Sequence, residues 1–284
     1  MSNRTKKENS HYKEPVHFEP GEAISGEVTP RSQDCRVANS PHNDLGHLKR
    51  SPRNAYGDEV AIKHLAIIMD GNRRWAKEHK LPAIEGHRHG AQKIKTIISN
   101  VIEFNIPYLT LYTFSSENWN RSQDEVSWLL NLLGLYLKKE LTNLMKNGIR
   151  LKVIGRLELL NEKLRSQINE AMLSTKDNNK ITLCIAFSYG GRWEIIDACK
   201  KIIDSGAKEF NESDFKNYLY DPEMPDVDML IRTGGSFRIS NFLLWQSSYA
   251  ELYFSAKYWP DFNKQDLTNM VNDYFAIRRT FGAQ

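Results

Sequence analysis

The sequence predicts a single α/β domain built on a mostly parallel central sheet flanked by helices. From residue 61 onward, short apolar runs alternate with longer amphipathic runs, and the apolar runs are too continuously hydrophobic to face water on one side. This alternation is typical of doubly wound sheets. The candidate strands are residues 61–69, 107–114, 149–154, 181–187, 227–232 and 252–254, and the candidate helices lie near 87–104, 122–147, 157–175, 191–206, 212–220 and 263–279.

The composition supports one sizeable folded domain preceded by a different kind of segment. The chain has 284 residues and is 40% hydrophobic, which is sufficient for a large core. Residues 1–60 are poor in core-forming side chains, balanced in charge and punctuated by proline and glycine, so we predict a disordered N-terminal extension. The folded domain is then predicted to occupy residues 61–284.

Charge, cysteine content and hydropathy narrow the class of protein. The net charge of +4 is modest for this length and lacks a concentrated basic stripe, so we expect no nucleic-acid partner. Cys35, Cys184 and Cys199 are odd in number and widely spaced, which is typical of reduced thiols. The sequence has no apolar signal core and no apolar run long enough to span a membrane, so we expect a cytoplasmic protein.

The stretch from His64 to Lys77 combines an apolar run with a polar turn and two arginines. A strand that turns directly into a helix is a common phosphate site, because turn amides and the helix N-terminus point toward the ligand. Asp70 would repel a phosphate unless a divalent metal lay between them, which predicts a magnesium-diphosphate site. The alternative is a helix N-terminal carboxylate with solvated arginines. The candidate ligands are Asp70, Gly71, Asn72, Arg73, Arg74 and Trp75.

Two later loops have the composition of ligand-binding segments. The loop after the 107–114 strand is rich in hydroxyls, amides and charge, although Ser122 and Glu125 also fit an ordinary capped loop. The loop after the 227–232 strand has two glycines with arginines and serines, as in a second diphosphate cradle or in a structural turn. The candidates are Ser115, Ser116, Glu117, Asn118, Trp119 and Arg121 in the first loop, and Arg232, Arg238, Ile239 and Ser240 in the second.

Two isolated polar residues and one helix complete the candidate site. Glu251 is an acid within an apolar segment, where its burial is costly unless it pairs with a metal or an arginine, so it is a candidate partner for the magnesium at Asp70. His87 is either a helix cap or a diphosphate ligand. The 122–147 helix is apolar almost all round, which fits either a central buried helix or the wall of an apolar substrate tunnel.

These segments together resemble the cis-prenyltransferase family, and within it the bacterial undecaprenyl diphosphate synthases (isoprenyl transferases). The resemblance covers residues 64–282 and rests on the specific motifs HLAIIMDGNxRWA, GHxxG, FSSENWxR, YGGRW, IRTGGxxRISNF and AELYF. The sequence has no two adjacent aspartates, which argues against the unrelated all-helical trans-prenyltransferases.

The resemblance implies a homodimeric enzyme that extends an allylic diphosphate, typically farnesyl diphosphate, by successive additions of isopentenyl diphosphate with cis double bonds. It implies Mg²⁺ as cofactor and undecaprenyl diphosphate as a long-chain lipid-carrier precursor. Because so apolar a product must eventually reach a membrane, we expect transient contact of the enzyme with a membrane surface at product release. The resemblance also implies roles for residues that match the family motifs: Asp70 and Glu251 in metal binding, Asn118 in proton removal, Gly71, Asn72, Arg73, Arg74 and His87 at the allylic diphosphate, and Arg232, Arg238 and Ser240 at isopentenyl diphosphate.

The chain departs from the family pattern at two positions. Ala83 stands where many relatives carry an arginine, and Arg73 stands where many carry glycine, so Arg73 is a candidate replacement for the missing guanidinium. Two rival functions are a catalytically idle scaffold subunit and a nucleic-acid module. The first would be expected to lose the acidic and arginine residues that are retained here, and the second predicts binding that falls steeply with salt.

Overall fold

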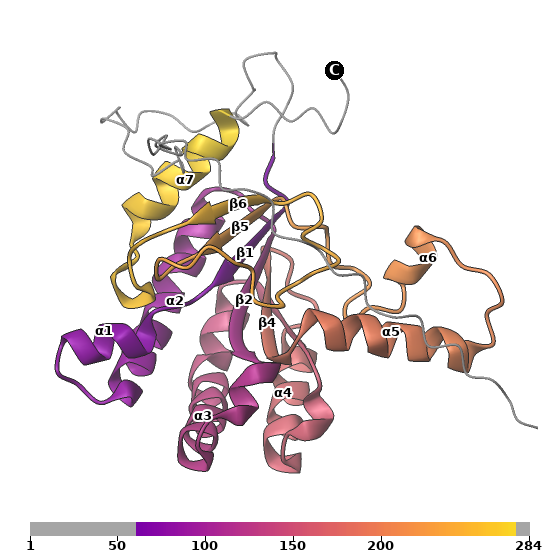
Figure 1. The fold of residues 1–284 in the computed structure, drawn as a ribbon, viewed down its shortest axis with the longest axis horizontal. Helices are drawn as coiled ribbons and strands as arrows, with labels where there is room; N and C mark the ends of the chain where they lie inside the picture. The colour runs from indigo at the N-terminus through magenta and orange to yellow at the C-terminus, as the bar shows by residue number, and fades with distance from the viewer. Residues whose placement is uncertain (1–60, 277–284) are drawn as a thin grey trace, which may run out of the picture. The chain divides into compact units, whose positions relative to one another are not determined.

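Six parallel strands form one sheet in the order β3-β4-β2-β1-β5-β6 (Figure 1). The structure is a computed structural model that describes residues 61–276, so the prediction for residues 1–60 lies outside the described part. All pairings in this sheet are parallel, which confirms the predicted α/β class. The strands are β1 (His64–Ile68), β2 (Tyr108–Ser115), β3 (Ile149–Ile154), β4 (Ile181–Tyr189), β5 (Met229–Arg232) and β6 (Glu251–Phe254).

The helices follow the predicted order with a few changed boundaries. The predicted 157–175 helix is divided, because the side chain of Asn161 accepts a hydrogen bond from the Leu164 amide and begins a new helix there. A short helix over 72–78 precedes the next one, which begins directly after Pro82, four residues before the predicted start. The helices are α1 (Asn72–Glu78), α2 (Ala83–Glu103), α3 (Gln123–Lys146), α4 (Glu162–Ser174), α5 (Gly191–Ser205), α6 (Glu212–Lys216) and α7 (Lys264–Ala276), with 3₁₀ helices η1 (Ser116–Asn120), η2 (Leu157–Leu159) and η3 (Trp259–Asp261).

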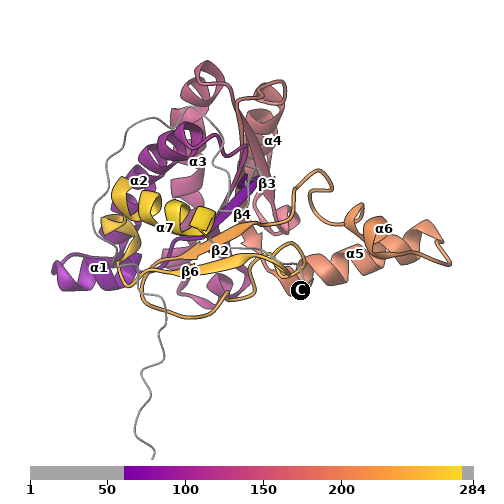
Figure 2. The same ribbon diagram turned by 90° about the horizontal axis from the view of Figure 1, so that it is seen from above.

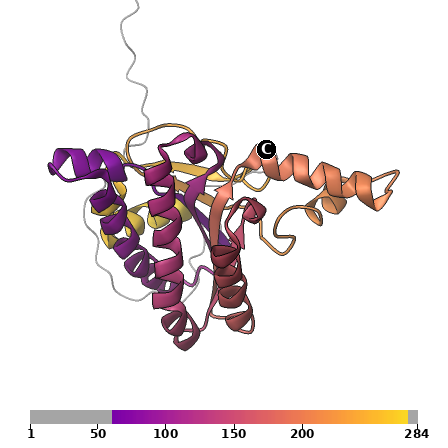
Figure 3. The same cartoon turned by 90° about the horizontal axis from the view of Figure 1, so that it is seen from below.

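Alternate side chains of each strand enter two different cores. In β1, Leu65 and Ile67 join the core beneath α2, α3, α4 and α7, whereas Ala66 and Ile68 face the chain between β5 and β6. Figure 2 shows α7 beside α2, and Figure 3 shows α2 and α3 next to each other, while α5 and α6 extend to one side of the sheet. Burial on both faces explains why the strand sequences are continuously apolar.

The parallel arrangement brings the carboxyl ends of the strands to one edge of the sheet. Asp70 follows β1, η1 follows β2 and Thr233 follows β5, so three of the predicted polar segments begin at this edge. Within residues 61–276, no helix combines the length and apolar character needed to cross a membrane.

Candidate active site

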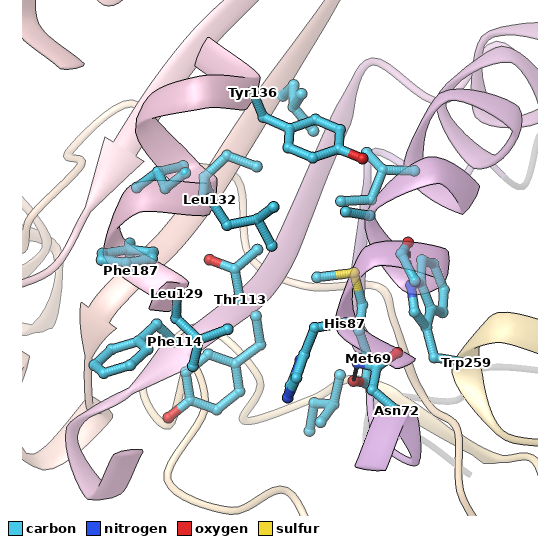
Figure 4. A pocket seen from close by; sticks show the side chains of 18 of the residues that line it. Met69, Asn72, His87, Thr113, Phe114, Leu129, Leu132, Tyr136, Phe187 and Trp259 are labelled. Carbon is cyan, nitrogen blue, oxygen red and sulfur yellow. Dashed lines mark hydrogen bonds between the residues drawn. The ribbon is translucent and has the colours of Figure 1, made fainter. Parts of the chain in front are cut away.

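A cavity of about 890 Å³ begins at the carboxyl edge of the sheet and runs between α2, α3 and the strands. Figure 4 shows His87 and Asn72 near one end, Tyr136 of α3 near the other and Leu132 between them. Between these ends the walls are mainly aliphatic and aromatic side chains, such as those of Leu129 and Phe187. One side of α3 therefore lines an apolar tunnel while other residues of the same helix pack in the core.

Asp70 lies at the polar end of this cavity between two arginines. Its two carboxylate oxygens are 2.9 Å from Arg232 Nη2 and 3.1 Å from Arg74 Nη2. Partial burial on its own would raise the pKa of Asp70, but the hydrogen bond and charge of Arg232, with those of Arg74, lower it below its ordinary value. Thr233 fixes the backbone of the turn, since its hydroxyl donates to the Asp70 carbonyl at 2.7 Å. The carboxylate is thus held ionised and oriented.

Arg232 connects Asp70 to the loop after β5. Its Nη1 donates to Ser240 Oγ and to the backbone carbonyl of Arg238, both at 2.6 Å, and the residue is only 4% exposed. Its Nε is a buried donor with no partner among the described residues. Arg232 also lines the cavity, where its guanidinium group offers positive charge to an anion.

The loop after β2 is held by its own side chains. Asn118 Oδ1 accepts a hydrogen bond from the Ser115 amide at 3.1 Å, in a capping box that closes η1. Trp119 packs edge-on against Phe114 and donates to Ser188 Oγ, so it faces the protein interior and not the cavity. Ser115, Glu117, Asn118 and Arg121 line the cavity.

Two arginines and one histidine lie near the carboxylate of Glu125 at the start of α3. Arg121 Nη1, Arg73 Nη1 and His87 Nε2 lie 2.9, 3.7 and 3.9 Å from its carboxylate oxygens. Burial, and then the positive charge of Arg121, lower the pKa of His87 to about 4, so its imidazole is neutral at pH 7. Arg73 therefore lies near His87 on the shared Glu125 carboxylate, although it does not itself line the cavity.

Within one chain, the structure does not bring Glu251 next to Asp70, and the metal role of Glu251 stays a prediction. The β5–β6 register places Glu251 opposite Met229, three residues before Arg232, so Glu251 lies at the amino edge of the sheet and Asp70 at the carboxyl edge. No group of three or more Asp, Glu, His or Cys suited to a metal occurs within residues 61–276. Mg²⁺ is commonly bound by one or two carboxylates together with substrate phosphates, and Asp70 alone fits that donor set.

The predicted site residues fall into two groups: those that line the cavity and those that do not. Trp75 belongs to the second group, because its indole N–H donates to Asp261 and its ring stacks on His79, away from the cavity. Sequence reasoning missed Tyr112 and Asn241, although Asn241 directly follows the predicted Ser240. The cavity is lined by Asp70, Asn72, His87, Ser115, Glu117, Asn118, Arg121, Arg232 and Ser240, but not by Gly71, Arg73, Arg74, Trp75, Ser116, Trp119, Arg238, Ile239 or Glu251.

Comparison with known proteins assigns this fold and cavity to a family. The family model of prenyltransferases described as undecaprenyl diphosphate synthase matches residues 68–282. The chain belongs to this family. It is 67% identical over 221 residues to the isoprenyl transferase of Rickettsia bellii, covering 78% of this chain and 98% of the relative, and 45% identical over 224 residues to that of Thermotoga maritima, covering 78% and 96%.

Solved structures of the family share the architecture. A probable undecaprenyl diphosphate synthase from Campylobacter jejuni is 37% identical with a TM-score of 0.69, and the match covers 78% of this chain and 99% of that one. Lavandulyl diphosphate synthase from Lavandula x intermedia, in complex with dimethylallyl diphosphate, is 34% identical with a TM-score of 0.76, covering 79% and 100%. The predicted resemblance and the assignment as a prenyltransferase are confirmed.

Proposed function

We propose that this prenyltransferase is a Mg²⁺-dependent cis-polyprenyl diphosphate synthase. It condenses isopentenyl diphosphate onto an allylic diphosphate, farnesyl diphosphate, and the product is the lipid-carrier precursor undecaprenyl diphosphate. The observation that carries the proposal is the continuity of one cavity: a polar end with Asp70 and Arg232 opens into an apolar tunnel between α2 and α3. An allylic diphosphate has the same division between a charged head and a hydrocarbon tail. The relatives named isoprenyl transferase support this choice.

The polar end supplies groups for two diphosphates. Asp70 would hold Mg²⁺ with diphosphate oxygens, and the bound ion would neutralise charge on the departing allylic diphosphate. Asn72, His87 and Arg73 lie on the side of α1 and α2, which suits the allylic diphosphate, while Arg232 and Ser240 suit isopentenyl diphosphate. The position of Arg232 on the cavity wall supports this second role.

The chemistry requires that a carbocation-like allylic group be protected from water. The aliphatic wall of the tunnel excludes water around the hydrocarbon tail. A proton must leave the condensed product, and an amide such as Asn118 is a poor base near neutral pH. We assign Asn118 the positioning of the η1 loop, because its side chain already caps that loop, and we assign proton acceptance to the released diphosphate.

The exposed edge of the sheet supports a homodimer. β6 is an edge strand, and Leu252, Tyr249 and Phe237 in or beside it are exposed by 47%, 75% and 68%. Large apolar side chains gathered at a sheet edge are a common interface between subunits. We also propose a cytoplasmic enzyme that contacts a membrane surface transiently when the apolar product leaves, and a catalytic domain over residues 61–284.

Incubation with labelled isopentenyl diphosphate, farnesyl diphosphate and Mg²⁺ tests the proposal. We expect a series of products of increasing length that ends in a C55 diphosphate, and loss of product when Mg²⁺ is chelated or in the Asp70→Ala variant. Absence of condensation by the wild-type chain, or full activity of Asp70→Ala, would contradict the proposal. Binding of polynucleotide that weakens steeply with salt would favour the nucleic-acid alternative.

A further inference from the structure

Asn241 lies where three loops of the carboxyl edge meet. It follows Ser240 in the segment between β5 and β6, and both residues have positive φ, at 48° for Ser240 and 63° for Asn241. Asparagine tolerates this left-handed conformation better than most residues, because its short side chain forms local hydrogen bonds. Its backbone can therefore turn sharply here while its amide faces the neighbouring loops.

Both polar atoms of the Asn241 side chain have partners in other loops. Its Oδ1 accepts a hydrogen bond from the Arg192 amide at 2.9 Å, at the start of α5. Its Nδ2 donates to Glu117 Oε1 at 3.0 Å and to Ser116 Oγ at 3.4 Å, in the loop after β2. Its backbone carbonyl accepts from the Gly191 amide at 2.7 Å. One amide side chain thus links segments that follow β2, β4 and β5.

The packing at this junction is close. A Cβ atom added at Gly190 would lie 2.5 Å from Ser116 Oγ and 2.8 Å from Asn241 Nδ2, so the strand-to-helix turn admits no larger residue there. This explains part of the YGGRW motif: its first glycine makes room for the contact between the other two loops.

We propose that Asn241 is a positioning residue that fixes the loop after β2 relative to the diphosphate cradle after β5. On one side it holds Ser116 and Glu117, next to the cavity residues Ser115 and Asn118. On the other side it adjoins Ser240, which accepts a hydrogen bond from Arg232. The inference rests on the proposed function, in which the two loops hold two reacting diphosphates at a set separation. Small errors in such a separation reduce turnover strongly.

A double-mutant cycle between Asn241 and Glu117 tests this coupling. Asn241→Asp keeps the shape and the acceptor for Arg192 but opposes one carboxylate with another. We expect its kcat to fall about 100-fold with much smaller changes in the KM of either substrate, since a misplaced group costs that much in well-oriented reactions. Glu117→Gln/Asn241→Asp restores a donor and an acceptor, so we expect it to regain at least tenfold over Asn241→Asp.

The matched control is Asn131→Asp, an exposed position on α3 that does not line the cavity. It adds the same charge and is expected to keep wild-type kcat. Wild-type turnover in Asn241→Asp, or a double variant no better than Asn241→Asp while both keep the wild-type melting temperature, would overturn the inference.

Hydrogen–deuterium exchange gives a second readout that does not depend on activity. Asn241→Gly retains the backbone conformation but removes the amide, so we expect faster exchange of the Arg192 amide and of residues 116–121. Asn241→Asp should keep the Arg192 amide protected and loosen only residues 116–121. If the wild-type chain forms no product, the proposed function fails while exchange still decides this inference, and unchanged exchange in Asn241→Gly overturns it.

Discussion

At the residue scale, the site depends on charges that are oriented before any ligand arrives. Asp70 is held between Arg232 and Arg74. Arg232 contacts Asp70 through Nη2 and donates to Ser240 through Nη1. Such preorganisation is the usual origin of electrostatic catalysis, because the groups do not need to rearrange as charge develops. The same arrangement makes the residues depend on each other for stability.

Asp70→Asn is expected to reduce condensation by at least 100-fold, as is typical when one preorganised charged group is removed. It is also expected to lower the free energy of unfolding by about 2 kcal/mol at pH 7, since Arg232 is buried and loses an ionised partner. Urea unfolding and product assays measure the two effects. Asp124→Asn, at an exposed position in the first turn of α3, is the matched control. An unchanged unfolding midpoint in Asp70→Asn would contradict the stability argument.

The buried ring of His64 is expected to make the free energy of unfolding depend on pH. Its ring is fully buried between the Pro225 carbonyl and Thr110 Oγ1, and burial lowers its pKa from 6.5 to about 4. Between these values the unfolded chain binds a proton that the folded chain does not, so stability falls as the pH decreases from 6.5 to 4. The loss amounts to roughly 3 kcal/mol for this one group. Unfolding midpoints across this range check it, and a His64→Gln variant should show a shallower decrease. An equal slope in both proteins would contradict it.

Residue types were easier to predict from the sequence than side-chain directions. Asp70, Arg232 and Ser240 line the cavity as expected, because each directly follows the end of a parallel strand or lies in its loop. Trp75 turns away to Asp261, 186 positions later in the chain, and no local pattern contains that partner. Asn241 was missed for a similar reason, since its partners come from two other loops.

At the element scale, two glycines allow α2 to approach the polar turn. A Cβ atom at Gly86 would lie 2.0 Å from the backbone oxygen of Asn72, and one at Gly90 would lie 2.3 Å from Asn72 Oδ1. The GHxxG motif thus provides close packing of α2 against the start of α1, in addition to His87. This contact places Asn72 at the mouth of the cavity.

Gly86→Ala is therefore expected to destabilise the fold by about 2 kcal/mol, the usual cost of overpacking, and to lower activity because Asn72 must move. Gly134→Ala in α3 is the matched control, because the nearest atom to its Cβ would be the flexible end of Gln167 at 3.0 Å, and alanine favours the helix. Thermal unfolding compares the two. Equal melting temperatures for both variants would contradict the packing argument.

The register of the strands also explains why the sequence alone could not locate Glu251. A strand was predicted over 252–254, next to Glu251, but the edge of the sheet at which Glu251 lies could not be found without the register. Helix boundaries show a similar effect, as the start of α2 depends on Pro82 and the division near Asn161 depends on a cap.

At the scale of the whole molecule, the alternation of buried strands and amphipathic helices was sufficient to predict the class of fold. Strand order and the cavity between α2 and α3 depend on tertiary packing, which a single sequence does not specify directly. The family match begins at residue 68, the last residue of β1. Function in this chain is therefore expected to reside in residues 61–284.

Removal of residues 1–60 is expected to leave the melting temperature and the rate of condensation close to those of the full chain. The curated relatives support this, since the isoprenyl transferase of Rickettsia bellii is covered over 98% of its length by 221 residues of this chain. Calorimetry and product assays on both proteins check it. A large loss of activity with an unchanged melting temperature would show that the extension contributes to catalysis.

In the proposed reaction, a hydrocarbon chain grows from the polar end of the cavity into the tunnel beside α3. The length distribution of products made by the wild-type chain and by Leu132→Trp tests it most directly, because Leu132 lines the middle of that tunnel. We expect C55 products for the wild type and distinctly shorter ones for Leu132→Trp, with comparable initial rates of the first condensation. Identical product lengths from two folded proteins, or no condensation by the wild type, would contradict it.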